Sequence, residues 1–251
     1  MNVSRLLSVA ALTAALAAPA FAESSGGFLV RLGRDTTSAE RYSRDGNRVI
    51  VDQVGRSPRV MQRHFEYELA PDGALRHLSL VVRAAGAPAG APPTQTIEAT
   101  VAHDSLTVVV RRDTSVQTMR LAAPAQTAIV ALSSPWVVYE LLTMKLAKGK
   151  ADSLKVPMVL LGGNNLFEMV VRRLGRDSVE LENAEGLYHM KVARDGRILG
   201  VSPLRGTAQF TAERIDGLDL SAYTSDFSAS EAKAGAMGTL SPRDSVIVAN
   251  A

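Results

Sequence analysis

The sequence predicts a mainly β protein, a strongly curved antiparallel meander sheet or incomplete barrel, with one covering α-helix at about residues 134–148. Apolar and polar side chains alternate with a period of two from Gly27 to Asp216, as in strands that bury one face and expose the other. Asp-Gly pairs, which suit tight hairpin turns, separate the alternating runs. One segment, the 134–148 stretch, has helical spacing instead.

Residues 1–22 have the layout of a cleavable secretory signal peptide. Arg5 supplies a positive charge, an apolar stretch runs from Leu6 to Ala18, and a small-x-small pattern ends at Ala22. The alternative, a buried N-terminal helix, is disfavoured because the segment ends in a cleavage pattern. The apolar stretch is also too short to span a bilayer. We therefore expect a periplasmic or secreted protein, cleaved after Ala22, with no transmembrane segment after cleavage.

Residues 23–220 are expected to form one antiparallel β domain that contains the helix. The strongest hairpin signal is Pro71-Asp72-Gly73 between two alternating runs, 61–69 and 78–82. A further turn is expected at Gly175-Arg176-Asp177-Ser178. A meander of about ten or more strands must curl, close or split into two layers. We therefore expect a curved sheet or an incomplete barrel.

The helical segment begins with Ser134, a good N-cap residue, and Pro135, which is favoured at the first helical position. A helix this apolar near its start cannot face water all round, so we expect it to lie across the open face or mouth of the sheet. Such a mouth is a place where small ligands bind. The residues expected to line a ligand pocket there, unless they are simply core, are Trp136, Tyr139, Leu142 and Met144.

The C-terminal part of the chain differs in composition. Residues 221–238 are rich in Ser, Ala and Gly and are predicted to be a flexible linker. The segment Thr239-Leu240-Ser241-Pro242-Arg243-Asp244-Ser245-Val246 resembles the opening of a bacterial β domain called domain of unknown function 2911. This resemblance implies that 239–251 is the start of a further, truncated β domain, in a longer exported protein or a truncated gene product.

The body of the chain also resembles uncharacterised exported bacterial β proteins with a half-barrel plan. The residues that carry this resemblance are Gly27-Phe28-Leu29-Val30, the hairpin meander and the Pro-Trp start of the helix. The layout is similar to that of periplasmic half-barrels that carry lipid-like cargo. The resemblance implies an apolar small molecule or a lipid as a candidate ligand.

Charge and motifs exclude several function classes. The chain has 28 basic and 25 acidic residues, interspersed along the strands, so nucleic acid is not an expected partner. No cysteine is present, and no hydrolase, phosphate-loop or metal motif appears, so we predict no catalytic residue, metal or cofactor. His64 and His77 flank one hairpin but are expected to lie about four positions out of register.

The adjacent arginines Arg111-Arg112 and Arg172-Arg173 should each split between the two faces of a strand. The inward member needs a carboxylate partner or a wet cavity, which is a hint of a pocket with a polar end; the alternative is an arginine that reaches solvent from a strand end. The leading hypothesis is an exported, non-enzymatic module that binds an apolar or amphipathic ligand or an envelope partner. The alternatives are an accessory domain with a downstream partner domain, and a hydrolase of unknown substrate. Ser133 and Ser134 could supply a nucleophile only with a distant histidine, and Ser134 is expected to serve as the helix cap instead.

Overall fold

The computed structural model describes residues 24–236, except 57–58, 89, 125–126, 131–133, 162–164, 185 and 207–208. The predicted signal peptide (1–22), Ser133 and the C-terminal segment 239–251 therefore lie outside the described residues.

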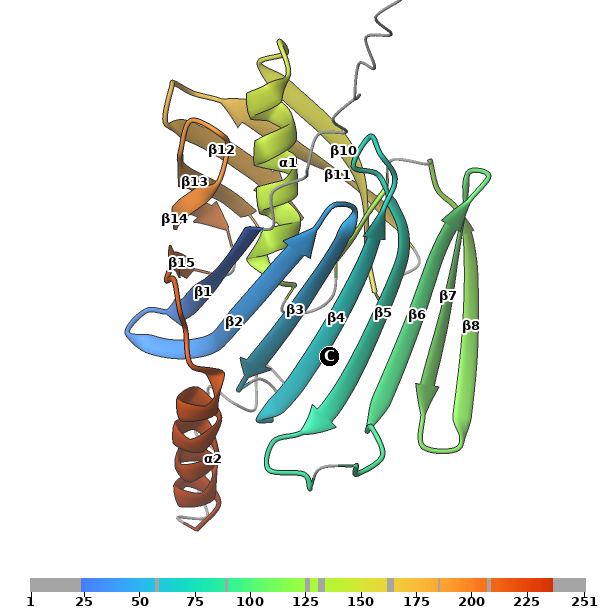
Figure 1. Ribbon diagram of the computed structural model, residues 1–251, viewed down its shortest axis with the longest axis vertical. Helices are drawn as coiled ribbons and strands as arrows, with labels where there is room; N and C mark the ends of the chain where they lie inside the picture. The colour runs from blue at the N-terminus through green and yellow to red at the C-terminus, as the bar shows by residue number, and fades with distance from the viewer. Residues whose placement is uncertain are drawn as a thin grey trace, which may run out of the picture.

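The described chain forms one sheet of 15 strands, in the order β8-β7-β6-β5-β4-β3-β2-β1-β15-β14-β13-β12-β11-β10-β9 (Figure 1). The first and the last strand pair at the centre of the sheet, so the middle of the chain supplies both edges. The strands are β1 (Ser24–Leu32), β2 (Asp35–Asp45), β3 (Arg48–Gly55), β4 (Met61–Leu69), β5 (Leu75–Ala84), β6 (Gln95–Ala102), β7 (Ser105–Arg112), β8 (Ser115–Ala122), β9 (Ala128–Val130), β10 (Ser153–Leu160), β11 (Leu166–Arg173), β12 (Ser178–Asn183), β13 (Gly186–Val192), β14 (Ile198–Gly206) and β15 (Phe210–Arg214).

The predicted fold class is confirmed. Neighbouring strands are antiparallel except for β9, which pairs with β10 in parallel. The sheet curves strongly but stays open, and among the described residues β8 and β9 are its two edges. The Asp-Gly pairs predicted as turns at residues 45–46, 72–73 and 195–196 do join consecutive antiparallel strands. The pair at 216–217 instead follows the last strand and leads into a helix.

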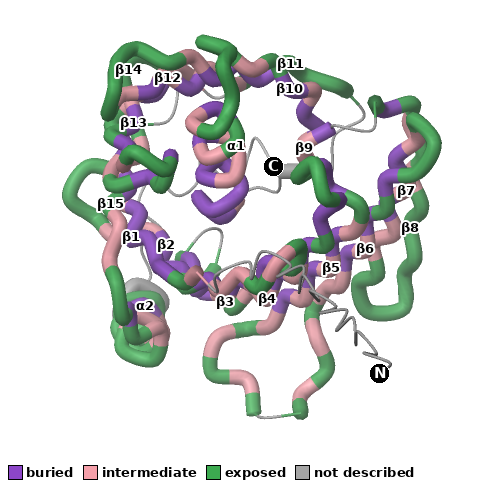
Figure 2. Tube along the Cα trace, turned by 45° about the horizontal axis from the view of Figure 1, so that its top comes forward, coloured by how far each residue is buried: buried purple, intermediate pink, exposed green. Residues whose placement is uncertain are grey.

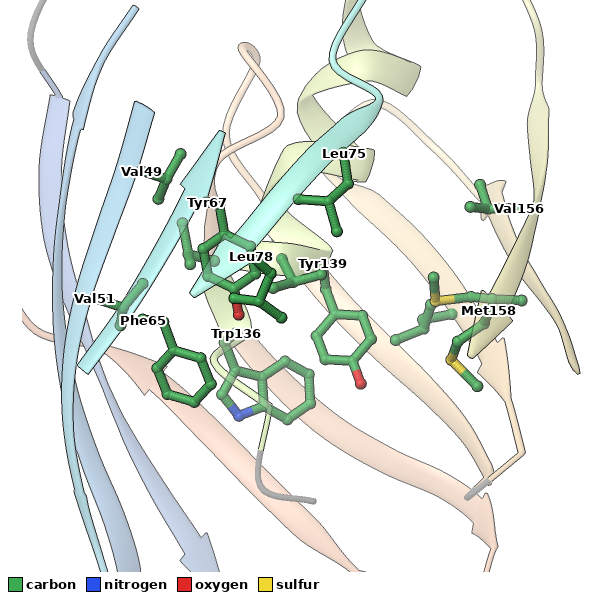
Figure 3. Packing of buried hydrophobic residues seen from close by; sticks show 14 of the residues in the cluster. Val49, Val51, Phe65, Tyr67, Leu75, Leu78, Trp136, Tyr139, Val156 and Met158 are labelled. Carbon is green, nitrogen blue, oxygen red and sulfur yellow. The ribbon is translucent and has the colours of Figure 1, made fainter. Parts of the chain in front are cut away.

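The helix α1 (Trp136–Lys148) lies inside the curve of the sheet, as Figure 2 shows. The prediction of a helix at about 134–148 is confirmed. The helix lies within the curve of the sheet (Figure 2), whereas the sequence led us to expect it across the open face or mouth. In the first turns of the helix, residues on all sides are buried, because the curved sheet faces the helix from several directions. In Figure 3 Trp136 and Tyr139 lie among Phe65, Leu78 and Met158, which come from β4, β5 and β10.

The predicted flexible linker at 221–238 is wrong for most of its length, because α2 (Leu220–Ala236) is a helix. Its apolar residues follow helical spacing at Leu220, Tyr223 and Phe227. Phe227 is buried in a small second core on the outer face of the sheet, with Leu29 and others. The Ser- and Ala-rich composition concealed this stripe. In the chain that the structure describes, neither helix has the length and apolar character needed to cross a membrane.

Candidate functional site

The N-terminus of α1 is held by a carboxyl group from the sheet. Glu40 of β2 is fully buried, and its Oε1 accepts a hydrogen bond from the backbone N–H of Trp136 at 2.6 Å. Its Oε2 accepts one from Nε2 of Gln53, at 3.2 Å. The predicted N-cap, Ser134, is wrong by one position, because the N-cap is Pro135, which makes no side-chain cap bond. Glu40 satisfies the first free N–H of the helix instead.

Glu40 is mostly uncharged at neutral pH. Burial raises its pKa to about 8, although the hydrogen bonds from Trp136 and Gln53 favour the charged form. The nearby Glu140 also raises this pKa. A neutral Glu40 therefore avoids placing two buried negative charges beside each other.

Glu140 anchors the first half of α1 to three strands, β2, β14 and β15. Its Oε2 accepts hydrogen bonds from Nη1 of Arg214 at 2.6 Å and from the backbone N–H of Ile198 at 2.8 Å. Its Oε1 accepts a hydrogen bond from the hydroxyl of Tyr42. Arg214 closes the network, because its Nη2 donates to that same hydroxyl at 2.8 Å.

The ion pair between Arg214 and Glu140 is buried, with side chains 7% and 2% exposed. Removing water from two charges is costly, so such a pair stabilises only when its geometry and remaining hydrogen bonds are good. Here each carboxylate oxygen has a donor, and no buried side-chain polar atom among the described residues lacks a partner. The network therefore fixes where α1 sits within the sheet.

Two further contacts hold the second half of the helix. Thr143 donates from Oγ1 to the carbonyl of Gly196, in the loop between β13 and β14, at 2.6 Å. Arg173 donates from Nη2 to the carbonyl of Leu146, near the C-terminus of α1, at 2.8 Å. Arg173 is one member of a predicted arginine pair, and its partner Arg172 pairs with Glu180 at 2.8 Å. Arg173 also lies 3.9 Å, from Nε to Oδ1, from the carboxylate of the exposed Asp152. It therefore has the carboxylate partner that the sequence suggested, and it also reaches solvent at the end of its strand, as the alternative expected.

The other predicted arginine pair lies in an exposed part of the sheet. Arg111 and Arg112 end β7, and Nη2 of Arg112 donates to the side chain of Gln95 at 3.2 Å. These two residues take no part in the site around α1.

The structure separates the four predicted pocket residues into two groups. Trp136 and Tyr139 are core: their rings lie 5.2 Å apart, and the Trp136 ring meets that of Tyr188 at 6.1 Å, edge to face. Both are 7% exposed. Leu142 and Met144 instead line a cavity beside the second half of α1.

The cavity has a volume of about 230 Å³ and lies between α1 and the loop that joins β4 to β5. Exposed lysines from the last turn of the helix line it, so it reaches the surface. Its apolar walls come from the helix, from β4 and β5 and from β10. The larger apolar side chains are Tyr67, Leu69, Leu75, Val138, Leu141, Leu142, Met144 and Val156.

The histidines and the serine–histidine pair of the described residues lie in separate places on the sheet. No group of three metal-ligating side chains gathers there, and His64 and His77 lie opposite Val81 and Glu68, four positions apart. Ser178 and His189 do contact, at 2.6 Å between Oγ and Nε2. Within the described chain no carboxylate contacts the other ring nitrogen of His189, so the third member of a hydrolase triad is missing there.

Sequence reasoning missed the polar anchor of α1. Glu140 is the one acidic residue in the otherwise apolar first half of the helix, and Glu40 stands at an inward position of its strand, between Ser38 and Tyr42. An acidic residue at a position that the pattern assigns to the core is a signal of a buried partner. The partner itself, Arg214, is 74 residues away from Glu140 and has no local signal.

No family model matches the chain, and no curated protein matches its sequence. Four chains of solved structures are similar to it, among them the following two. One is a DUF1089 family protein from Pseudomonas aeruginosa, at a TM-score of 0.48 and 12% identity, covering 78% of this chain and 95% of that one. The other is a β-barrel-like protein of domain of unknown function DUF1849 from Brucella abortus, at 0.47 and 10%, covering 76% and 95%. At this identity the likeness concerns the fold alone.

Proposed function

We propose that this protein is an exported, periplasmic module that holds the apolar part of a small amphipathic molecule in the cavity beside α1. The observation that carries the proposal is the cavity itself, about 230 Å³ with apolar walls and an exposed rim. Concave, mostly apolar pockets with a few polar groups are the usual sites of small ligands. The export half of the proposal rests on the signal-peptide layout of residues 1–22.

The anchoring of α1 supports this role. Glu40, Glu140 and Arg214 hold the first half of the helix against the sheet, while Leu142 and Met144 face the cavity from the second half. One wall of the cavity is therefore fixed by buried polar contacts that a ligand does not touch. A site whose walls are fixed before binding loses less entropy when a ligand enters.

Ligand uptake is tested with cis-parinaric acid, an unbranched fatty acid whose fluorescence rises in apolar surroundings. We expect saturable binding to the purified protein, and loss of binding in Leu142→Trp, because the indole fills the cavity. The matched control is Leu174→Trp, which adds the same ring at a residue that is 56% exposed and does not line the cavity. Unsaturable binding, or equal binding by both variants, would rule out this site.

A further inference from the structure

The rim of the cavity is basic. Three cationic residues line it, Arg44 from β2 and Lys145 and Lys148 from the last turn of α1, against one acidic residue, Asp72. The two lysines are three positions apart, so they stand on the same side of the helix. Two separate elements thus bring positive charge to the lining of one mostly apolar cavity.

The charges on this rim are not neutralised within the described part of the protein. Neither Lys145 nor Lys148 has an ion-pair partner there. Asp72 has no ion-pair partner among the described residues either, and its Oδ1 accepts a hydrogen bond from the backbone N–H of Ala74 at 3.0 Å, which holds this carboxylate in the turn. Arg44 donates from Nε to the carbonyl of Gly46 at 3.0 Å, which orients its guanidinium. Its terminal nitrogens have no hydrogen-bond partner among the described residues, so they can meet a ligand.

Lysines near a helix C-terminus also interact favourably with the helix dipole, whatever the function. That interaction explains Lys145 and Lys148 taken alone. It does not explain Arg44, which belongs to another element and lines the same cavity. The dipole also acts on Lys150, which follows the helix and does not line the cavity, so Lys150 separates the two explanations.

We propose that the ligand is a single-chain amphiphile with an anionic headgroup, whose chain enters the cavity and whose acidic group meets Lys145, Lys148 and Arg44. This inference rests on the proposed function and specifies the chemistry of its ligand. At about 230 Å³ the cavity is smaller than the roughly 300–1,000 Å³ of pockets that enclose a drug-sized molecule. It therefore suits one acyl chain, and a two-chain lipid would not fit.

The experiment compares cis-parinaric acid with its methyl ester, which has the same chain without the charge. The two ligands are titrated against the wild type and two variants, Lys148→Glu and Lys150→Glu. The two variants carry the same change in charge at positions two residues apart. We expect the affinity for the acid to fall roughly tenfold in Lys148→Glu and less than about twofold in Lys150→Glu. The affinity for the ester should stay within about twofold of the wild-type value in both variants. Added salt should weaken the binding of the acid and leave the binding of the ester unchanged.

Thermal melting of Lys148→Glu and a second variant, Lys148→Gln, show whether the helix end is intact; the Gln variant should show an intermediate loss for the acid. If the acid and the ester bind the wild type with equal affinity, the headgroup inference is wrong while the cavity proposal stands. The same holds if Lys148→Glu and Lys150→Glu reduce the affinity for the acid equally. If neither compound binds the wild type saturably, the proposed function fails and the inference falls with it.

Discussion

At the residue scale, two buried glutamates on neighbouring elements behave differently because their partners differ. Glu140 has a cationic partner in Arg214, at 2.6 Å, with both side chains almost fully buried. Glu40 is held by an amide and a backbone N–H, and burial raises its pKa to about 8. One carboxyl thus serves as a charged anchor and the other as a neutral cap.

The raised pKa of Glu40 predicts a pH dependence of stability. The pKa lies at about 8 in the folded protein, against an ordinary value of 4.5. Between these values the unfolded chain has lost the proton and the folded one keeps it, so the free energy of unfolding falls as pH rises, by up to about 1.4 kcal/mol per pH unit. Below this range the contribution is fully present, and above pH 8 it is lost.

Glu40→Gln, which keeps the neutral shape, should remove that slope. The measurement is urea unfolding of both proteins from pH 5 to 9, with the difference in free energy plotted so that other titrating groups cancel. We expect the variant to gain stability relative to the wild type as pH rises. A difference that does not change with pH would show that Glu40 is ionised in the folded protein.

Loss of the cation beside Glu140 should be costly. Arg214→Met leaves a buried carboxylate without its counter-charge, which costs about 3–5 kcal/mol. The exposed pair Arg31–Glu213, at 3.0 Å with side chains 35% and 60% exposed, is the control: Arg31→Met should cost at most about 1 kcal/mol.

Denaturant unfolding measures both losses, and the double variant Glu140→Gln/Arg214→Met should recover part of the larger one. Equal losses in Arg214→Met and Arg31→Met would show that the buried pair is no stronger an anchor than a surface pair.

At the scale of elements, α1 is positioned by loops as well as by the sheet. The loop between β13 and β14 approaches the helix so closely that a Cβ on Gly196 would lie 2.5 Å from the carbonyl oxygen of Thr143. Gly196 also has a φ of +88°, in the region that side chains rarely adopt. Only glycine meets both requirements, so this position couples the hairpin to the helix.

Gly196→Ala should therefore destabilise the protein much more than Gly46→Ala. Gly46 has a φ of +57° in the loop between β2 and β3, but no atom lies within 4 Å of its added Cβ. The loss at Gly46 should be about 1–2 kcal/mol, from the backbone alone. At Gly196 we expect at least about 2 kcal/mol more, because α1 must move. Thermal unfolding compares the two, and equal losses would mean that the hairpin does not restrain the helix.

At the scale of the whole molecule, local patterns predicted the parts of the fold that neighbours in sequence determine. Alternation predicted the strands, and Asp72-Gly73 and Asp195-Gly196 predicted their turns. The pairing of β1 with β15 was not predictable, because it joins segments about 180 residues apart, such as Leu29 and Glu213. The helix α2 was missed because its apolar stripe is short.

The candidate site, too, could be predicted only in part from the sequence. Leu142 and Met144 do line the cavity, whereas Trp136 and Tyr139, which were predicted with them, are core. Helical spacing shows which residues share a face, but which face meets sheet and which meets open space depends on how far the sheet curves. The basic rim was missed for the same reason, since Arg44 and Lys148 are far apart in the sequence and line one cavity only in the folded protein.

The most direct test of the whole account is a crystal structure of the protein with bound decanoate, a short fatty acid that fits one chain into the cavity. We expect electron density for the chain between Leu142 and the β4–β5 loop, with the carboxylate beside Lys148. Decanoate bound elsewhere, or a cavity filled by the protein's own side chains, would contradict it.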